Sequence, residues 1–232
     1  MPRAVWLLFF AALAAQLFLQ AAEAPPSAHA AALPRAMPAA VVRIASLDEP
    51  LAAAQLLTLY LQAFDNQPGI SIPFKDLDYR SVTSWLESSL ALDPATQYPL
   101  FMAAHLYAQV PDPAKQRLML DFVHGKFLED PARRWRWLAH ASLIAKHRLH
   151  DNRLALRYAD DIARLAPHAP SWARQMRIFI LEDMGEIESA AIMLGGLLAT
   201  GEITDPSEAR FLTERLEQMK KSAEKSPRTS KN

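Results

Sequence analysis

The chain has 232 residues, 51% of them hydrophobic, and its formal net charge is zero. This hydrophobic content excludes a chain that is disordered throughout, and the balanced charge gives no global attraction to nucleic acid. Cysteine is absent, which excludes disulfides, cysteine-ligated zinc and thiol catalysis, and a chain rich in alanine and leucine with only 6 glycines favours helix over sheet.

The N-terminal segment, residues 1–22, is predicted to be a signal peptide or a signal anchor. An apolar run over residues 4–22 follows the positive charge of Arg3. At about 1.5 Å per residue such a run spans ~28 Å as a helix, which matches a bilayer core. Two interpretations stay open, namely cleavage at the small-x-small site Ala28-His29-Ala30 or an uncleaved single-pass anchor in a bacterial inner membrane. Both place the rest of the chain in the periplasm.

Residues 23–45 are expected to be a linker. Four prolines lie among alanines here, and this composition favours an extended spacer that holds the folded part away from the membrane. The helical domain, residues 46–221, then begins with Ser46 and Glu49 in capping-box spacing and Pro50 in a first helical turn. The helix over 51–64 is apolar nearly all round, so we expect it to be buried.

A break follows over residues 65–74, where Pro68-Gly69 predicts a turn. Two interpretations of its apolar residues are kept. Ile70, Ile72 and Phe74 could pack onto the end of the helical array, or the segment could be a recognition loop.

Helical apolar spacing continues to residue 221. The predicted helices cover 78–92, 100–110, 113–128, 132–149, 152–165, 171–184, 186–198 and 206–221. The last of them is amphipathic and suits the capping of an open end of a stack. The remaining residues, 222–232, are basic and polar and are expected to form a disordered tail.

Four prolines punctuate this region in similar settings. They are Pro94, Pro131, Pro167 and Pro206, with gaps of 37, 36 and 39 residues. A period in this range is typical of stacked helix pairs.

An overlay of two of these helix pairs supports the interpretation as a repeat. A shift of 35 residues places Trp137 on Trp172 and Ala155 on Ala190, and the turn Gly185-Glu186-Ile187-Glu188-Ser189-Ala190 has the acidic and small residues of a second-helix start. Residues 77–200 therefore resemble the tetratricopeptide (TPR) repeat. The first-helix signature of that family is absent or displaced and the repeats are longer, so the resemblance is to a divergent TPR-like array. The whole chain is also similar to membrane-anchored bacterial envelope proteins.

The TPR resemblance implies an all-α, right-handed superhelix of antiparallel helix pairs. Its concave face, lined by the first helices, would bind a peptide or a partner helix. On the helices over 132–149 and 171–184 the residues expected on that face mix aromatic, cationic and acidic side chains, a combination that interfaces favour. The candidate partner-binding residues are Trp137, His140, Ile144, His147, Arg148, Trp172, Gln175, Phe179 and Glu182.

Several patterns that could carry chemistry have a plainer interpretation. His140, His147 and His150 invite a metal site, but no cysteine or HExxH spacing accompanies them, which favours solvated histidines. The segment Arg133-Arg134-Trp135-Arg136-Trp137 could stack on bases or clamp phosphate, but charge complementarity within the stack or to a partner is the favoured interpretation. The adjacent carboxylates Glu182-Asp183 point about 100° apart on a helix and make no acid/base pair.

The sequence therefore predicts a non-enzymatic periplasmic scaffold that binds a protein partner. No catalytic residue, cofactor or metal is expected, nor a nucleic-acid partner or a small-molecule substrate. One alternative is an accessory subunit of an envelope polysaccharide or secretion machine. Another is a divergent helical enzyme.

Overall fold

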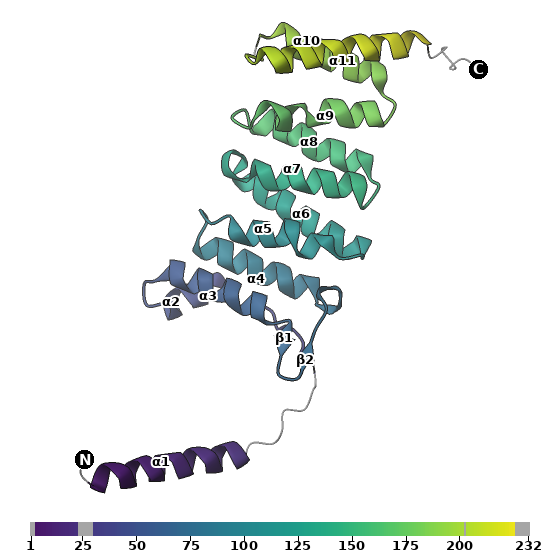
Figure 1. Cartoon of the computed structure of the whole chain (residues 1–232). Helices are drawn as coiled ribbons and strands as arrows, with labels where there is room; N and C mark the ends of the chain where they lie inside the picture. The colour runs from purple at the N-terminus through teal and green to yellow at the C-terminus, as the bar shows by residue number, and fades with distance from the viewer. Residues whose placement is uncertain (1–2, 23–29, 202, 226–232) are drawn as a thin grey trace.

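The structure, a computed structural model, describes residues 3–22, 30–201 and 203–225 and is all-α, as predicted (Figure 1). In this part of the chain the only strands are β1 (Asn66–Gln67) and β2 (Ile70–Ser71), which pair antiparallel. Residues 28–29 of the candidate cleavage site and residues 226–232 of the expected tail lie outside the described residues, and residues 222–225 of that tail are helical instead of disordered.

The N-terminal segment forms one helix, α1 (Arg3–Ala22), drawn apart from the other helices in Figure 1. Most of its large apolar side chains are exposed, Leu8 and Phe18 most of all. Among the described residues, no helix combines the length and the hydropathy that crossing a membrane requires.

Residues 31–45 differ from the expected spacer, because they lie along α4 (Tyr79–Leu92) and end in the short helix α2 (Ala39–Ala45). The indole N–H of Trp85 donates to the carbonyl of Pro34 at 2.7 Å, and the backbone N–H of Ala36 donates to the hydroxyl of Ser84 at 3.0 Å. The polar side chains of α4 thus give hydrogen-bond partners to the extended, proline-containing backbone that precedes α2. We call residues 31–45 the strap.

The first helix of the stack is α3 (Pro50–Ala63), which packs on α4. Pro50 occupies the first turn as expected, but the capping box does not form, because the hydroxyl of Ser46 donates to the carbonyl of Arg43 at 2.7 Å. The expected burial of this helix is also wrong for one face, where Leu56 and Leu59 are exposed. Helix α3 packs against α4 and the short α2, and these two contacts leave the face with Leu56 and Leu59 uncovered.

The segment between α3 and α4 packs on the stack, as the first of its two interpretations expected. Ile72 is buried, and the ring of Phe74, in the short 3₁₀ helix η1 (Phe74–Asp76), makes an edge contact with Tyr107 at 5.5 Å between centroids. Gly69, with φ 77°, supplies the left-handed residue of the β1–β2 turn.

The remaining helices pack in chain order, each against its predecessor (Figure 1). They are α5 (Tyr98–His105) with its 3₁₀ extension η2 (Tyr107–Gln109), α6 (Pro113–Glu129), α7 (Pro131–His147), α8 (Asn152–Leu165), α9 (Ser171–Asp183), α10 (Ile187–Ala199) and α11 (Pro206–Lys225). The main core runs from the strap to α9, and a second core joins α9, α10 and α11.

The four prolines that marked the repeat have two different roles. Pro131 and Pro206 open helices, as Pro113 also does, and in each case the preceding aspartate accepts a hydrogen bond from a backbone N–H two or three residues later. Pro94 and Pro167 instead lie in turns after a helix has ended. The four prolines therefore do not occupy equivalent positions in the helix pairs.

Candidate functional site

The nine candidate residues do not form one continuous surface. Ile144 is only 4% exposed and belongs to the main core, and Gln175 is 5% exposed. His147, Arg148 and Trp172 are exposed, with Trp172 against the ring of Trp135 at 5.7 Å. The assignment of Ile144 and Gln175 to an open face is therefore wrong, because both point between helices.

Three of the four candidates on α9, namely Gln175, Phe179 and Glu182, pack against α11, whereas Trp172 stays exposed. The amide of Gln175 donates to the carboxylate of Glu208 at 2.8 Å, and the guanidinium of Arg215 contacts both oxygens of Glu182, at 2.6 and 3.1 Å. Phe179 packs into the second core, which α11 shares. An intramolecular helix thus occupies the place expected for a partner.

Two of the candidates on α7, Trp137 and His140, belong to an aromatic cluster with α5. Trp137 makes edge contacts with Phe101 at 6.0 Å and with His105 at 5.8 Å between centroids, and its indole N–H donates to the amide oxygen of Gln97 at 2.7 Å. Tyr98 stacks on Phe101 at 5.7 Å. Consecutive first helices are therefore joined by packed rings.

His140 completes this cluster through a stack on His105. Burial lowers the pKa of His105, and burial together with the charge of His105 lowers the pKa of His140 to about 4. Both imidazoles are therefore neutral near pH 7 and add aromatic surface, not cationic charge.

An open groove lies beside the cluster, with a volume of about 490 Å³. Thr96, Gln97, Tyr98, Phe101 and Trp137 line it, and Tyr98 is 44% exposed. We call this the aromatic groove. Its rings present apolar surface, and the hydrogen bond to Gln97 fixes the orientation of the largest of them.

Sequence reasoning found Trp137 and His140 but missed the α5 half of the site. One signal was available: the 35-residue shift that relates Trp137 to Trp172 also relates His105 to His140. Tyr98 and Phe101 carry no such signal, since α5 is short and its boundaries do not follow the period.

The arginine–tryptophan segment at the start of α7 is used within the fold. Arg134 is 3% exposed, and its guanidinium donates to the carbonyls of Lys126 at 2.7 Å and Pro94 at 3.2 Å. Arg133 pairs with Asp130. Arg148 is exposed, yet its guanidinium donates to the carbonyl of Gln109 at 3.1 Å and so also contacts the preceding helix pair.

Few of the titratable groups come together. His124 and Asp161 form a half-buried pair at 2.8 Å, and Asp161 also contacts Arg164. Burial raises the pKa of the neighbouring Asp160. Over residues 3–22, 30–201 and 203–225, no group of three or more His, Asp or Glu side chains is placed to hold a metal ion.

Comparison of the chain with protein-family models, with curated proteins and with solved structures finds no match.

Proposed function

We propose that this chain is a non-enzymatic scaffold in which an apolar segment of a partner protein occupies the aromatic groove. The observation that carries the proposal is the set of rings fixed in place along α5 and α7, with Tyr98 still exposed. Rings that are held before binding lose little conformational freedom on binding, and aromatic side chains dominate interface energies.

The scaffold is, in this proposal, a divergent TPR-like superhelix. The starts of its second helices, at residues 79, 113, 152 and 187, support a repeating helix pair. So does the packing of each helix on its predecessor. The groove uses the first helices of two successive pairs, and an array of this kind offers such helices to partners.

Photo-crosslinking at one position tests the proposal. A benzophenone amino acid replaces Tyr98 in the full chain, and the control carries it at Tyr60, which is equally exposed and also stacks on a neighbouring ring, that of Trp85. We expect one protein partner to crosslink from Tyr98 and not from Tyr60. A Phe101→Ala change should weaken that crosslink. Identical products from both positions, or none from Tyr98, would contradict the proposal.

The export of the stack by residues 4–22 belongs to the same proposal. The exposed apolar side chains of α1 support it, because they would be covered by a membrane or by the export machinery. A reporter fused after residue 232 should be active outside the cytoplasm. Activity in the cytoplasm would place the scaffold there instead. If the crosslinked partner belongs to a polysaccharide or secretion machine, the chain is an accessory subunit of it.

A further inference from the structure

One face of α3, at the end of the stack that α2 and α3 form, is left bare (Figure 1). Helix α3 packs on α4, with Thr58 and Leu61 buried, and the hydroxyl of Thr58 lies 2.9 Å from that of Ser89 in a hydrogen bond. Leu56 and Leu59 precede these two buried residues by two positions, which places them about 160° around the helix. Their side chains are 66% and 58% exposed.

The exposed face continues along the whole helix. Steps of four, three and four residues separate its members, which are Ala52, Leu56, Leu59 and Ala63. We call them the α3 stripe. This spacing is the one along which helices pack on each other in bundles, and α3 contains no charged residue that would oppose such a contact. The stripe therefore has the pattern of a second helix–helix contact.

The opposite end of the stack is closed differently (Figure 1). Helix α11 has residues at the same spacing on its outer side, and all four are exposed and charged, namely Arg210, Glu214, Glu217 and Lys221. The terminal unit of a helical stack needs a polar outer face toward water. Helix α11 meets this requirement and α3 does not, so the α3 stripe is suited to contact with a protein surface.

A second copy of α3 matches the stripe residue by residue. In an antiparallel pair whose twofold axis passes between residues 57 and 58, Leu56 faces Leu59 of the second copy, and Ala52 faces its Ala63. The leucines fill the centre, and the alanines allow close approach at both ends. Since α3 is uncharged, the two copies bring no like charges together. A lipid surface matches less well, because helices that lie on membranes carry Lys or Arg on their polar side and α3 carries neither.

We propose that two copies of the chain pair through the α3 stripe, antiparallel about a twofold axis. This contact covers the face that the sequence predicts to be buried and that a single copy leaves exposed. A pair of 14-residue helices buries a small area, so the dimer is weak, with a dissociation constant on the order of 10 µM. The proposal does not depend on what occupies the aromatic groove. Tyr60 faces Gln55 of the second copy in this register, so a benzophenone there would join two copies, a product distinct from a partner crosslinked at Tyr98.

Disulfide crosslinking tests the register, because the chain has no cysteine of its own. Full chains carrying Leu56→Cys or Leu59→Cys are given different tags, mixed in detergent and oxidised. We expect the mixed disulfide, and likewise the one between Ala52→Cys and Ala63→Cys chains. Ala52→Cys alone is the control, since two copies of residue 52 lie ~16 Å apart in this register and a disulfide allows about 7 Å between Cα atoms. The control should give at least about tenfold less product.

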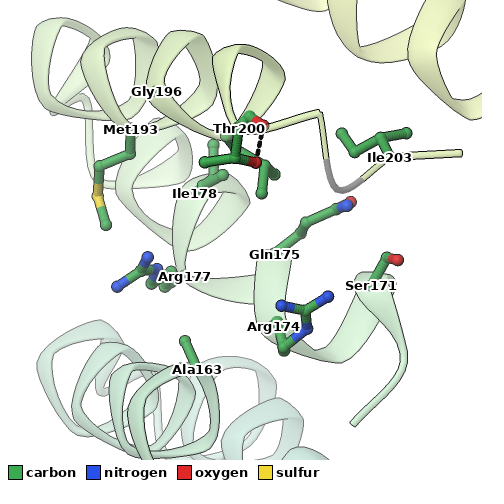
Figure 2. A pocket seen from close by; sticks show the side chains of 11 residues that line it. Ala163, Ser171, Arg174, Gln175, Arg177, Ile178, Met193, Gly196, Thr200 and Ile203 are labelled. Atoms are coloured by element: carbon green, nitrogen blue, oxygen red, sulfur yellow. Dashed lines mark hydrogen bonds between the residues drawn. The ribbon is translucent and has the colours of Figure 1, made fainter. Parts of the chain in front are cut away.

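Sedimentation of the full chain in detergent measures the self-association. Leu56→Arg should weaken it at least about hundredfold, because the twofold axis repeats the change in both copies and each buried leucine contributes about tenfold. Ile192→Arg, at a position of α10 that is 76% exposed, should leave it unchanged. The next residue, Met193, lines a cavity of about 460 Å³ between α8, α9 and α10 (Figure 2), which the change at Ile192 leaves intact.

Three results would overturn the proposal. A full chain that stays monomeric at roughly 100 µM would leave the stripe to α1 or to another protein. Self-association that survives Leu56→Arg would arise elsewhere, for instance from α1. A disulfide of Ala52→Cys with itself, as abundant as the mixed products, would mean that the helices do not pair in this antiparallel register. If Leu56→Arg fails to fold, the cysteine pairs decide the question, since they change only side chains of the exposed face.

Discussion

The imidazole rings of His105 and His140 stack face to face, with centroids 3.8 Å apart and planes at 12°. One ring comes from α5 and the other from α7, so the stack joins the first helices of two successive pairs. Two cations at this distance would repel strongly, and both rings are partly shielded from water. We therefore expect the contact to hold only while at least one imidazole is neutral.

The free energy of unfolding should consequently be lower in mild acid than near neutral pH. The pKa of His140 is lowered from 6.5 to about 4, mainly by burial and then by the charge of His105. As the pH falls, this imidazole is protonated in the unfolded chain before it is protonated in the folded chain. The contribution of His140 to the free energy of unfolding is therefore complete above pH 6.5 and is lost as the pH falls toward 4. Urea unfolding at pH 7.5 and 4.5 should show a loss on the order of 2 kcal/mol from this group.

The variant His140→Phe isolates that contribution, because phenylalanine keeps a ring against His105 and cannot titrate. Its free energy of unfolding should fall by on the order of 2 kcal/mol less than that of the parent over the same pH interval. His147→Phe, at the exposed last residue of α7, should behave like the parent. Equal pH dependence in all three proteins would show that the stack does not sense pH.

The helical class and most helix boundaries were predictable because their signals are local. An aspartate–proline pair caps and opens a helix wherever it occurs, and Asp112-Pro113 and Asp130-Pro131 do so as the sequence indicates. The strap was not predictable in this way. Its prolines favour an extended chain, but whether that chain is solvated or bound depends on Trp85 and Ser84, about 50 residues away.

The same limit applies to the candidate site. Helical periodicity places Ile144, Gln175 and Glu182 on one face, but it does not say which neighbour covers that face. The carboxylate of Glu208 accepts from Gln175 and the guanidinium of Arg215 donates to Glu182, and both partners belong to α11, 33 residues further along the chain. Trp137 was found because a tryptophan at a repeated position is conspicuous in sequence.

The docking of α11 should depend on its buried side and not on its outer side. Leu212 is 1% exposed in the second core, and the adjacent Phe211 is 56% exposed. Leu212→Ala should lower the free energy of unfolding by about 2–4 kcal/mol, because it removes buried methyl groups and leaves a cavity. Phe211→Ala should change it by about 0.5 kcal/mol or less. Chemical denaturation measures both, and similar losses would mean that α11 is not held as described.

Replacing Arg134 should lower the stability of the fold markedly, whereas replacing Arg133 should change it little. Arg134→Met leaves the carbonyls of Lys126 and Pro94 without their buried donor, which should cost about 2–3 kcal/mol of stability. Arg133→Met removes only an exposed ion pair with Asp130, which should cost at most about 1 kcal/mol. Thermal and urea unfolding of the two variants should separate them clearly. A mild Arg134→Met variant would show that the bonds of this guanidinium to Lys126 and Pro94 contribute little to stability.

The strap should loosen when its central hydrogen bond is removed. Trp85→Phe keeps a ring beside Tyr60 but deletes the indole N–H that donates to Pro34. A bond of this kind is worth about 0.5–1.5 kcal/mol, so amide exchange over residues 31–45 should accelerate roughly two- to tenfold. Hydrogen–deuterium exchange with peptide-level detection measures this. Trp172→Phe, which alters an exposed indole on α9, should leave the strap unchanged. Unchanged exchange in Trp85→Phe would mean that Ser84, Ser88 and the buried Val42 suffice to hold the strap on α4.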